Sequence, residues 1–213
     1  MMSLINKFRF HIIKGHSLKK LRSAPDFDRE AIYITFDDGP EPGITEFVLD
    51  ELGKYNIKGT FFCCGENCDK NPDLMRCIKE EGHSIANHTH SHINGYNTSS
   101  KLYVENVNKC EEYLNTNTFR PPWGALSLKL YNRLRKTYRI VYWDVVSGDT
   151  EMENFKFEIA YNNLVSKIKP GSIVLFHFCK KHEKETMQIL PAFLKFISEN
   201  KIKKKSLKMT FYL

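Results

Sequence analysis

Short apolar runs typical of buried strands alternate with amphipathic helical patterns along nearly the whole chain, and this alternation limits the possible folds more than any other feature. Strands are predicted at residues 31–36, 57–63, 83–87, 118–121, 139–145, 172–177 and 207–212. Helices are predicted between them, the last over residues 183–200, where Pro191 is expected to kink or split it. The pattern predicts an α/β fold in which helical crossovers join parallel strands.

Polar side chains that can do chemistry follow the ends of the predicted strands. They are Asp37, Asp38, His88, Arg120, Asp149 and His177. A doubly wound open sheet would spread these groups widely, whereas a barrel gathers the carboxyl ends of its strands around one mouth. We therefore predict an incomplete (β/α) barrel with about seven parallel strands and a single site at its mouth.

The composition fits one domain. With 213 residues and 41% hydrophobic content, the chain can form one sizeable core but not two comfortable domains. Residues 1–30 are expected to be a basic lead-in that packs on the barrel, and residues 31–213 the domain that carries the site. The six cysteines form no recognisable zinc ribbon or Cys-x-x-Cys pair, so we expect small core residues in a reducing compartment.

The net charge of +7 is concentrated at residues 7–22 and 201–208, on either side of the core. These runs fit solvated termini, or weak attraction to an anionic envelope polymer or membrane surface. No nucleic-acid-binding motif accompanies them, and no stable protein partner is implied. No apolar run approaches the roughly 20 residues that cross a bilayer, and no signal peptide is evident. We expect a cytoplasmic protein, with association to the envelope left open.

Two adjacent carboxylates end the first predicted strand, and two spaced histidines follow the third. Asp37 and Asp38 would repel each other unless a cation or a proton neutralises them. His88 and His92 are four residues apart, so they can face the same way. Two imidazoles and one carboxylate form a three-ligand site for a divalent metal, which leaves the other carboxylate for chemistry. A solvated corner and a surface histidine pair are the simpler alternatives.

The remaining strand ends carry an arginine, an acid and a histidine. Arg120 precedes a Pro-Pro-Trp-Gly sequence, whose fixed backbone angles would hold the guanidinium and the N–H of Trp123 in set directions. An arginine beside an aspartate favours the ionised acid. A carboxylate such as Asp149 can raise the pKa of His177 until it holds a proton near neutral pH, as a general acid must. Leu175 can line an apolar slot for a methyl group.

These blocks, in this order, resemble the polysaccharide deacetylases of the NodB-homology family (carbohydrate esterase family four) over about residues 30–212. The blocks that carry the resemblance are Thr35–Pro40, His88–His92, Arg120–Gly124, Asp149 and Leu175–His177. The resemblance implies a distorted (β/α) barrel, with residues 31–213 as the catalytic domain. It also implies hydrolysis of acetyl groups from N-acetylated sugars.

The resemblance implies how the metal and the base are divided among the acids and histidines. Asp38, His88 and His92 would hold one divalent ion, zinc or else cobalt or another metal. Asp37 would be the base that activates the attacking water.

The resemblance implies roles for the other strand ends as well. His177, oriented by Asp149, would protonate the leaving amine, and Arg120 would lie beside the base. The N–H of Trp123 would stabilise the oxyanion, and Leu175 would line the acetyl pocket. Loss of the acid or of an oxyanion donor would slow the reaction on the order of 10²–10³-fold.

Three residues depart from the family's pattern. Thr150 stands where an aromatic residue is usual, so one wall of the acetyl pocket is polar or supplied from elsewhere. Phe178 replaces an aspartate and can alter how His177 is held, and Trp123 replaces a tyrosine. Two other functions stay open: a carbohydrate-binding barrel that has lost turnover, and an esterase that acts on O-acetylated glycans.

Overall fold

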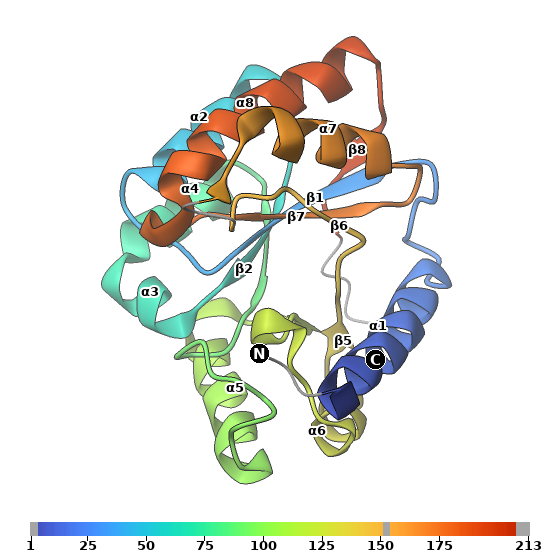
Figure 1. The fold of residues 1–213 in the computed structure, drawn as a ribbon. Coiled ribbons are helices and arrows are strands. Elements are labelled where there is room, and N and C mark those ends of the chain that lie inside the picture. The colour runs from blue at the N-terminus through green and yellow to red at the C-terminus, as the bar shows by residue number, and fades with distance from the viewer. Residues whose placement is uncertain (1–3, 151–153, 208–213) are drawn as a thin grey trace.

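The computed structural model describes residues 4–150 and 154–207. Parallel strands form one curled sheet in the order β5-β4-β3-β2-β1-β7-β6, with β8 paired to β1 (Figure 1). The strands are β1 (Ile32–Asp37), β2 (Thr60–Cys63), β3 (Ser84–Asn87), β4 (Thr118–Phe119), β5 (Arg139–Ile140), β6 (Val145–Val146), β7 (Ile173–His177) and β8 (Lys204–Lys205). The predicted incomplete barrel is confirmed.

The helices lie on both sides of the strands. They are α1 (Leu4–Arg22), α2 (Ile44–Lys54), α3 (Gly65–Lys70), α4 (Pro72–Glu80), α5 (Ser100–Leu114), α6 (Leu128–Leu134), α7 (Phe157–Lys167) and α8 (Glu183–Glu199), with 3-10 turns η1 (Pro122–Gly124) and η3 (Lys180–His182). In Figure 1, α2, α4, α7 and α8 lie above the strands, and α1, α5 and α6 lie below. None of the described helices is long and apolar enough to cross a membrane.

The central strand β1 alternates between two environments. Its residues Ile32, Ile34 and Phe36 pack into the apolar cluster beneath the upper helices. Tyr33 belongs to the second cluster, and Thr35 and Asp37 share its face of the strand because successive side chains point to opposite sides. The alternation therefore directs the hydroxyl of Thr35 and the first carboxylate into the barrel.

The prediction of one strand over residues 139–145 is wrong. Its two ends form separate strands at opposite edges of the sheet: β5 pairs with β4, and β6 pairs with β7. The segment between them changes partner, because the N–H of Val141 donates to Phe119 and the N–H of Asp144 donates to Ile173. Among the described strands β5 and β6 do not pair, so the barrel stays open at this seam.

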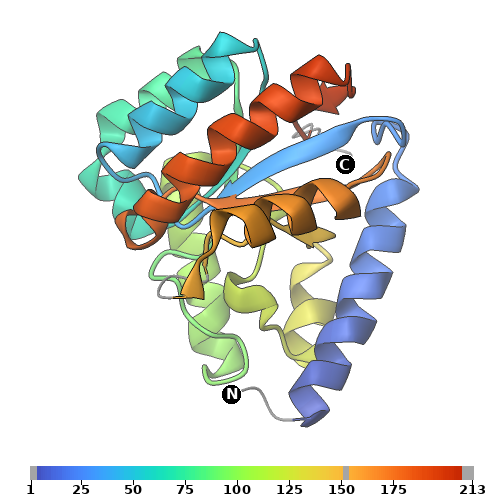
Figure 2. The ribbon, with the colours of Figure 1, turned by 45° about the horizontal axis from the view of Figure 1, so that its top comes forward.

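The basic lead-in contains a helix, α1, that runs beside the open seam (Figure 2). The ring of Phe10 lies 5.7 Å from that of Tyr142 and 6.2 Å from that of Trp143. At the other end of the helix, Arg22 forms a 2.7 Å ion pair with Asp144. These contacts attach α1 to the segment that links the two sheet edges.

Three smaller differences concern the predicted helices and the last strand. The short helix α3 was not predicted. The last helix, α8, is not split and continues across Pro191. The residues on either side of the proline, Leu190, Phe193 and Leu194, are buried in the core. The predicted strand at residues 207–212 lies, apart from its first residue, outside the described residues. The described strand β8 precedes it.

Candidate active site

The two adjacent carboxylates meet in one site because the chain turns sharply between them. Asp37, the last residue of β1, is 3% exposed and pairs in register with His177 of β7. Asp38 has a φ of 85°, a left-handed conformation that redirects its side chain away from the strand alternation. Its N–H donates to Phe62 at 3.2 Å, and its carbonyl accepts from Asn67 at 2.7 Å.

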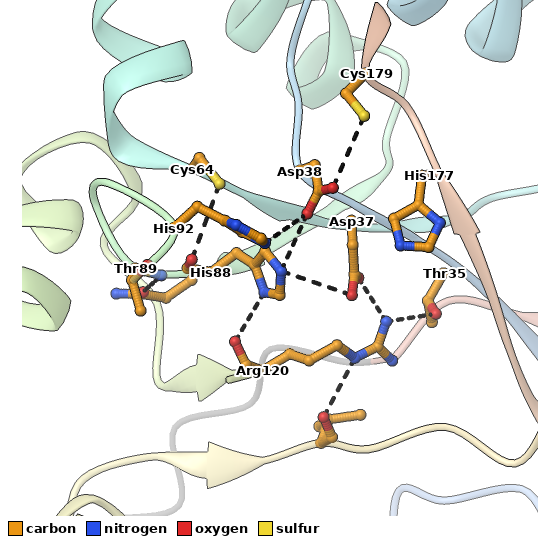
Figure 3. Close-up of polar contacts among 12 residues, drawn as sticks. Thr35, Asp37, Asp38, Cys64, His88, Thr89, His92, Arg120, His177 and Cys179 are labelled. Atoms are coloured by element: carbon orange, nitrogen blue, oxygen red, sulfur yellow. Dashed lines mark hydrogen bonds and ion pairs between the residues drawn. The ribbon is translucent and has the colours of Figure 1, made fainter. Parts of the chain in front are cut away.

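His88 and His92 both face Asp38 (Figure 3). The Nε2 atoms of His88 and His92 lie 3.3 and 3.1 Å from Oδ1 of Asp38. Nδ1 of His88 is 2.8 Å from the carbonyl oxygen of Arg120, and a carbonyl can only accept, so Nδ1 carries the proton. The contact between Nε2 and the carboxylate then needs either a second proton on His88 or a cation that the imidazole and the carboxylate share.

The donor atoms of Asp38, His88 and His92 lie within 4.8 Å of one another. Ligands of a tetrahedral zinc ion, at about 2.0–2.2 Å from the metal, are separated by roughly 3.3 Å, close to the distances found here. Burial opposes ionisation of Asp38, but the hydrogen bonds from His88 and His92 prevail and hold the pKa of this carboxyl well below its usual range. The three residues therefore fit a divalent cation.

Arg120 holds the other carboxylate. It is fully buried, and its Nη1 donates to Oδ1 of Asp37 at 2.6 Å and to the hydroxyl of Thr35 at 2.8 Å. Its guanidinium stacks on Phe62 at 3.9 Å, and Nε donates to the carbonyl of Val141. The second oxygen of Asp37 lies 3.8 Å from Nε2 of His88. One carboxylate oxygen is thus fixed by the guanidinium while the other faces the metal-ligand cluster.

His177 and Asp149 form a buried pair at the end of β7. Nδ1 of His177 lies 3.0 Å from Oδ1 of Asp149, whose Oδ2 accepts from the backbone N–H of His177 at 2.7 Å. Burial lowers the proton affinity of the imidazole, but the charge and hydrogen bond of Asp149 outweigh it and raise the pKa of His177 to about 9. The same pairing overcomes burial and lowers the pKa of Asp149. His177 therefore carries a proton at neutral pH.

Trp123 and Leu175 differ in their exposure to solvent at the site. Trp123 is 55% exposed, has a φ of 54°, and its ring lies 4.2 Å from the ring of His92. Leu175 is buried but belongs to neither apolar cluster of the described residues, and it precedes His177 by two positions, on the same face of β7. Both residues lie at the site.

The unusual residues Phe178 and Thr150 leave the histidine pair intact. Phe178 packs edge-on against Phe61 with ring centroids 5.1 Å apart, so it belongs to the core. The hydroxyl of Thr186 supports the pair instead, because it lies 3.1 Å from Oδ2 of Asp149. Thr150 is exposed.

Four residues at the site were not predicted from the sequence: Thr35, Thr186, Cys179 and His182. The period of two along β1 could have identified Thr35, which lies two residues before Asp37. Cys179 departs from the prediction that the cysteines are core residues, because its Sγ faces Oδ2 of Asp38 at 3.8 Å. All six cysteines are free.

Known proteins of one family are similar to this chain. A family model described as polysaccharide deacetylase matches residues 24–139. The chain is 35% identical over 161 residues to a peptidoglycan-N-acetylglucosamine deacetylase of Bacillus cereus, an alignment that covers 71% of this chain and 57% of the relative. It is 33% identical over 158 residues to a chitooligosaccharide deacetylase of Azorhizobium caulinodans, covering 70% of this chain and 74% of the relative.

The fold is similar to a solved structure as well. A crystal structure of a peptidoglycan N-acetylglucosamine deacetylase superposes with a TM-score of 0.79 at 29% identity, and the match covers 85% of this chain and 87% of that one. The chain spans little more than half the length of the Bacillus cereus relative.

Proposed function

Because the chain belongs to the polysaccharide deacetylase family, we propose that it is a metal-dependent hydrolase that removes acetyl groups from N-acetylated sugars. One observation carries the proposal: a cation-binding set of one carboxylate and two imidazoles lies beside a second carboxylate, Asp37, which stands in register with the protonated His177 on the neighbouring strand. A binding module has no use for a base and an acid placed beside such a set.

Asp38, His88 and His92 would hold one divalent ion, and zinc suits this mixed set of oxygen and nitrogen donors. An ion there would supply Lewis-acid chemistry, which lowers the pKa of water and polarises a carbonyl oxygen. The hydrogen bond from His88 to the carbonyl of Arg120 would fix the imidazole in the tautomer that a ligand requires.

Asp37 would be the general base. Arg120 occupies Oδ1 and keeps the carboxylate oriented, so Oδ2 is free to accept a proton from the attacking water. The water oxygen then bonds to the acetyl carbon. The N–H of Trp123 would stabilise the negative charge that develops on the acetyl oxygen.

His177 would be the general acid. When the bond between the acetyl carbon and the sugar nitrogen breaks, its imidazolium would give a proton to that nitrogen, so that amine and acetate leave. Asp149 acts through His177 as a positioning residue, because its two oxygens fix both the backbone and the ring of the histidine. Leu175 would pack against the acetyl methyl group.

We propose that the substrate is a glycan containing N-acetylglucosamine. The supporting observation is that the similar proteins named above are a peptidoglycan-N-acetylglucosamine deacetylase and a chitooligosaccharide deacetylase. The exposed ring of Trp123 offers a flat apolar surface on which a sugar can stack at the mouth of the site.

Acetate release tests the proposal. We expect the full chain to release acetate from N-acetylglucosamine oligomers or peptidoglycan fragments, to lose this activity in chelator, and to regain it with zinc or cobalt. Saturable glycan binding without acetate release at any metal loading would overturn the proposal in favour of a binding barrel. Release from O-acetylated but not N-acetylated substrates would indicate an esterase.

We also propose that α1 rests on an anionic membrane surface. Leu4, Ile5, Phe8 and Ile12 form an exposed apolar stripe, 49–85% exposed, that lines a groove with Leu128 of α6. The helix carries six lysines and arginines and no acidic residue. Exposed apolar side chains can enter the upper part of a bilayer, and neighbouring lysines and arginines are attracted to its anionic headgroups.

A further inference from the structure

Asp38 has a second set of neighbours, on the side away from the two histidines. In Figure 3, Cys179 lies across Asp38 from His88 and His92. The histidines face Oδ1 of the carboxylate, whereas Sγ of Cys179 lies 3.8 Å from Oδ2. The two oxygens of one side chain are thus directed at two different groups of donors.

The backbone after β7 places the second group. The N–H of Phe178 donates to the carbonyl of Asp37 at 3.0 Å, which holds the chain beside β1. The turn η3 follows, and the N–H of His182 donates to the carbonyl of Cys179 at 3.1 Å. His182 therefore lies next to the cysteine, with its ring 5.0 Å from the ring of His177.

Neither Cys179 nor His182 is part of the apolar core. Cys179 is 5% exposed and, like Cys64, belongs to neither apolar cluster, whereas Cys63, Cys68 and Cys110 belong to one. His182 is also 5% exposed, and its Nδ1 is buried without a hydrogen-bond partner among the described residues. An unsatisfied buried polar atom costs about 1–3 kcal/mol unless something else binds it.

We propose that Asp38, Cys179 and His182 form a second metal position, which shares Asp38 with the site described above. The three donor atoms lie within 4.8 Å of one another. A thiolate and an imidazole select zinc, cobalt or cadmium over magnesium or calcium. When the ion binds, the sulfur bonds to it as thiolate and the thiol proton passes to solvent, while His182 binds as neutral imidazole.

The proposal of a second metal position depends on the proposed function only through Asp38, which both metal positions share. It requires neither the base Asp37 nor the acid His177. Oδ1 of Asp38 would serve the ion at His88 and His92, and Oδ2 would serve the ion at Cys179. Two ions joined by one carboxylate are a familiar arrangement in hydrolases. The second ion has three protein ligands and an open position.

Cobalt binding tests this proposal, because a thiolate bound to Co²⁺ produces a charge-transfer absorption band. The full chain is stripped with chelator, kept reduced and titrated with Co²⁺, while equilibrium dialysis counts bound ions and absorbance follows the near-ultraviolet thiolate-to-cobalt charge-transfer band. We expect two ions per chain and a clear band. Cys179→Ser should abolish the band and one ion, and His182→Gln should also lose one ion.

Cys64→Ser is the matched control, since Cys64 is equally buried beside the site but its Sγ faces the carbonyl of His88. It should keep the band and both ions. The double variant His88→Gln, His92→Gln should lose one ion and keep the band. A single ion without a band in the full chain, or a band that survives Cys179→Ser, would overturn the second position.

Acetate release measured on the same samples separates this proposal from the proposed function. Chelator-sensitive release without a thiolate band would refute the second position alone, and a band without release would refute the deacetylase alone. If Cys179→Ser does not fold, the band of the full chain and the ion count of His182→Gln still decide the question.

Discussion

Asp149→Asn removes the charge that keeps a proton on His177. The carboxylate makes two contacts with this residue, at 3.0 Å to Nδ1 and 2.7 Å to the backbone N–H. An asparagine keeps the shape and can still accept one hydrogen bond, but it carries no charge. Burial, the largest influence on His177, lowers its pKa, and Asp149 opposes it more strongly than the charges of Asp38 and Asp37 do, so without Asp149 the pKa should fall clearly below about 9.

The structure sets the size of the effect. Each pKa unit corresponds to about 1.4 kcal/mol, so the rise from 6.5 to about 9 corresponds to roughly 3 kcal/mol of stability in the metal-free protein. Because the folded-state pKa is raised, this stability is fully present below pH 6.5 and is lost as the pH rises through about 9. Asp149, whose pKa is lowered, contributes stability that is fully present above its ordinary value of 3.8 and is lost as the pH falls through its lower folded-state pKa.

Imidazole NMR titrations of the metal-free full chain, assigned with His177→Gln, measure the pKa directly. Acetate release at pH 7 should fall on the order of 10²–10⁴-fold in Asp149→Asn, and the basic limb of its pH profile should move to lower pH. Asp144→Asn is the matched control, because it removes a paired carboxylate that contacts Arg22 instead. An equal pKa of His177 in wild type and Asp149→Asn would refute the reasoning.

Three further predictions concern the base, its arginine and the first helix. Asp37→Asn should lower kcat on the order of 10²–10⁴-fold with unchanged zinc content by metal analysis; loss of the zinc would contradict its assignment as base. Arg120→Gln leaves a buried acid unpaired and should cost about 3–5 kcal/mol in urea unfolding; the exposed pair lost in Arg76→Gln should cost at most about 1 kcal/mol. Phe8→Glu should release the protein from phosphatidylglycerol vesicles in sedimentation, and equal release by Leu102→Glu, an exposed leucine of α5, would count against a specific role of α1.

The site could be predicted from the sequence because its residues follow strand ends. Asp37 and His177 stand in register on neighbouring strands, and Arg120 follows β4. Parallel strands place such ends at one mouth, so a one-dimensional pattern was enough to bring together residues that are 140 positions apart.

Other features depend on contacts that leave no local signal. Residues 139–145 contain the apolar run Ile140–Trp143, yet the two ends of the segment bond to opposite edges of the sheet, which no periodicity reveals. Cys179 and His182 also escaped prediction, because a lone cysteine in an apolar sequence usually packs as a small hydrophobic residue. Its position beside Asp38 follows from the turn after β7 and not from spacing along the chain.

The backbone conformation at the site explains why sequence motifs predict which residues lie there better than they predict how those residues are arranged. Asp38, His92 and Trp123 all have left-handed φ values, of 85°, 46° and 54°. Each such residue costs roughly 1–3 kcal/mol and persists only where its surroundings fix it. Asn67 fixes Asp38 in this way, through a 2.7 Å bond to its carbonyl. The left-handed turn at Asp38 brings the carboxylate to the histidines, so the strain is part of what assembles the cation-binding set.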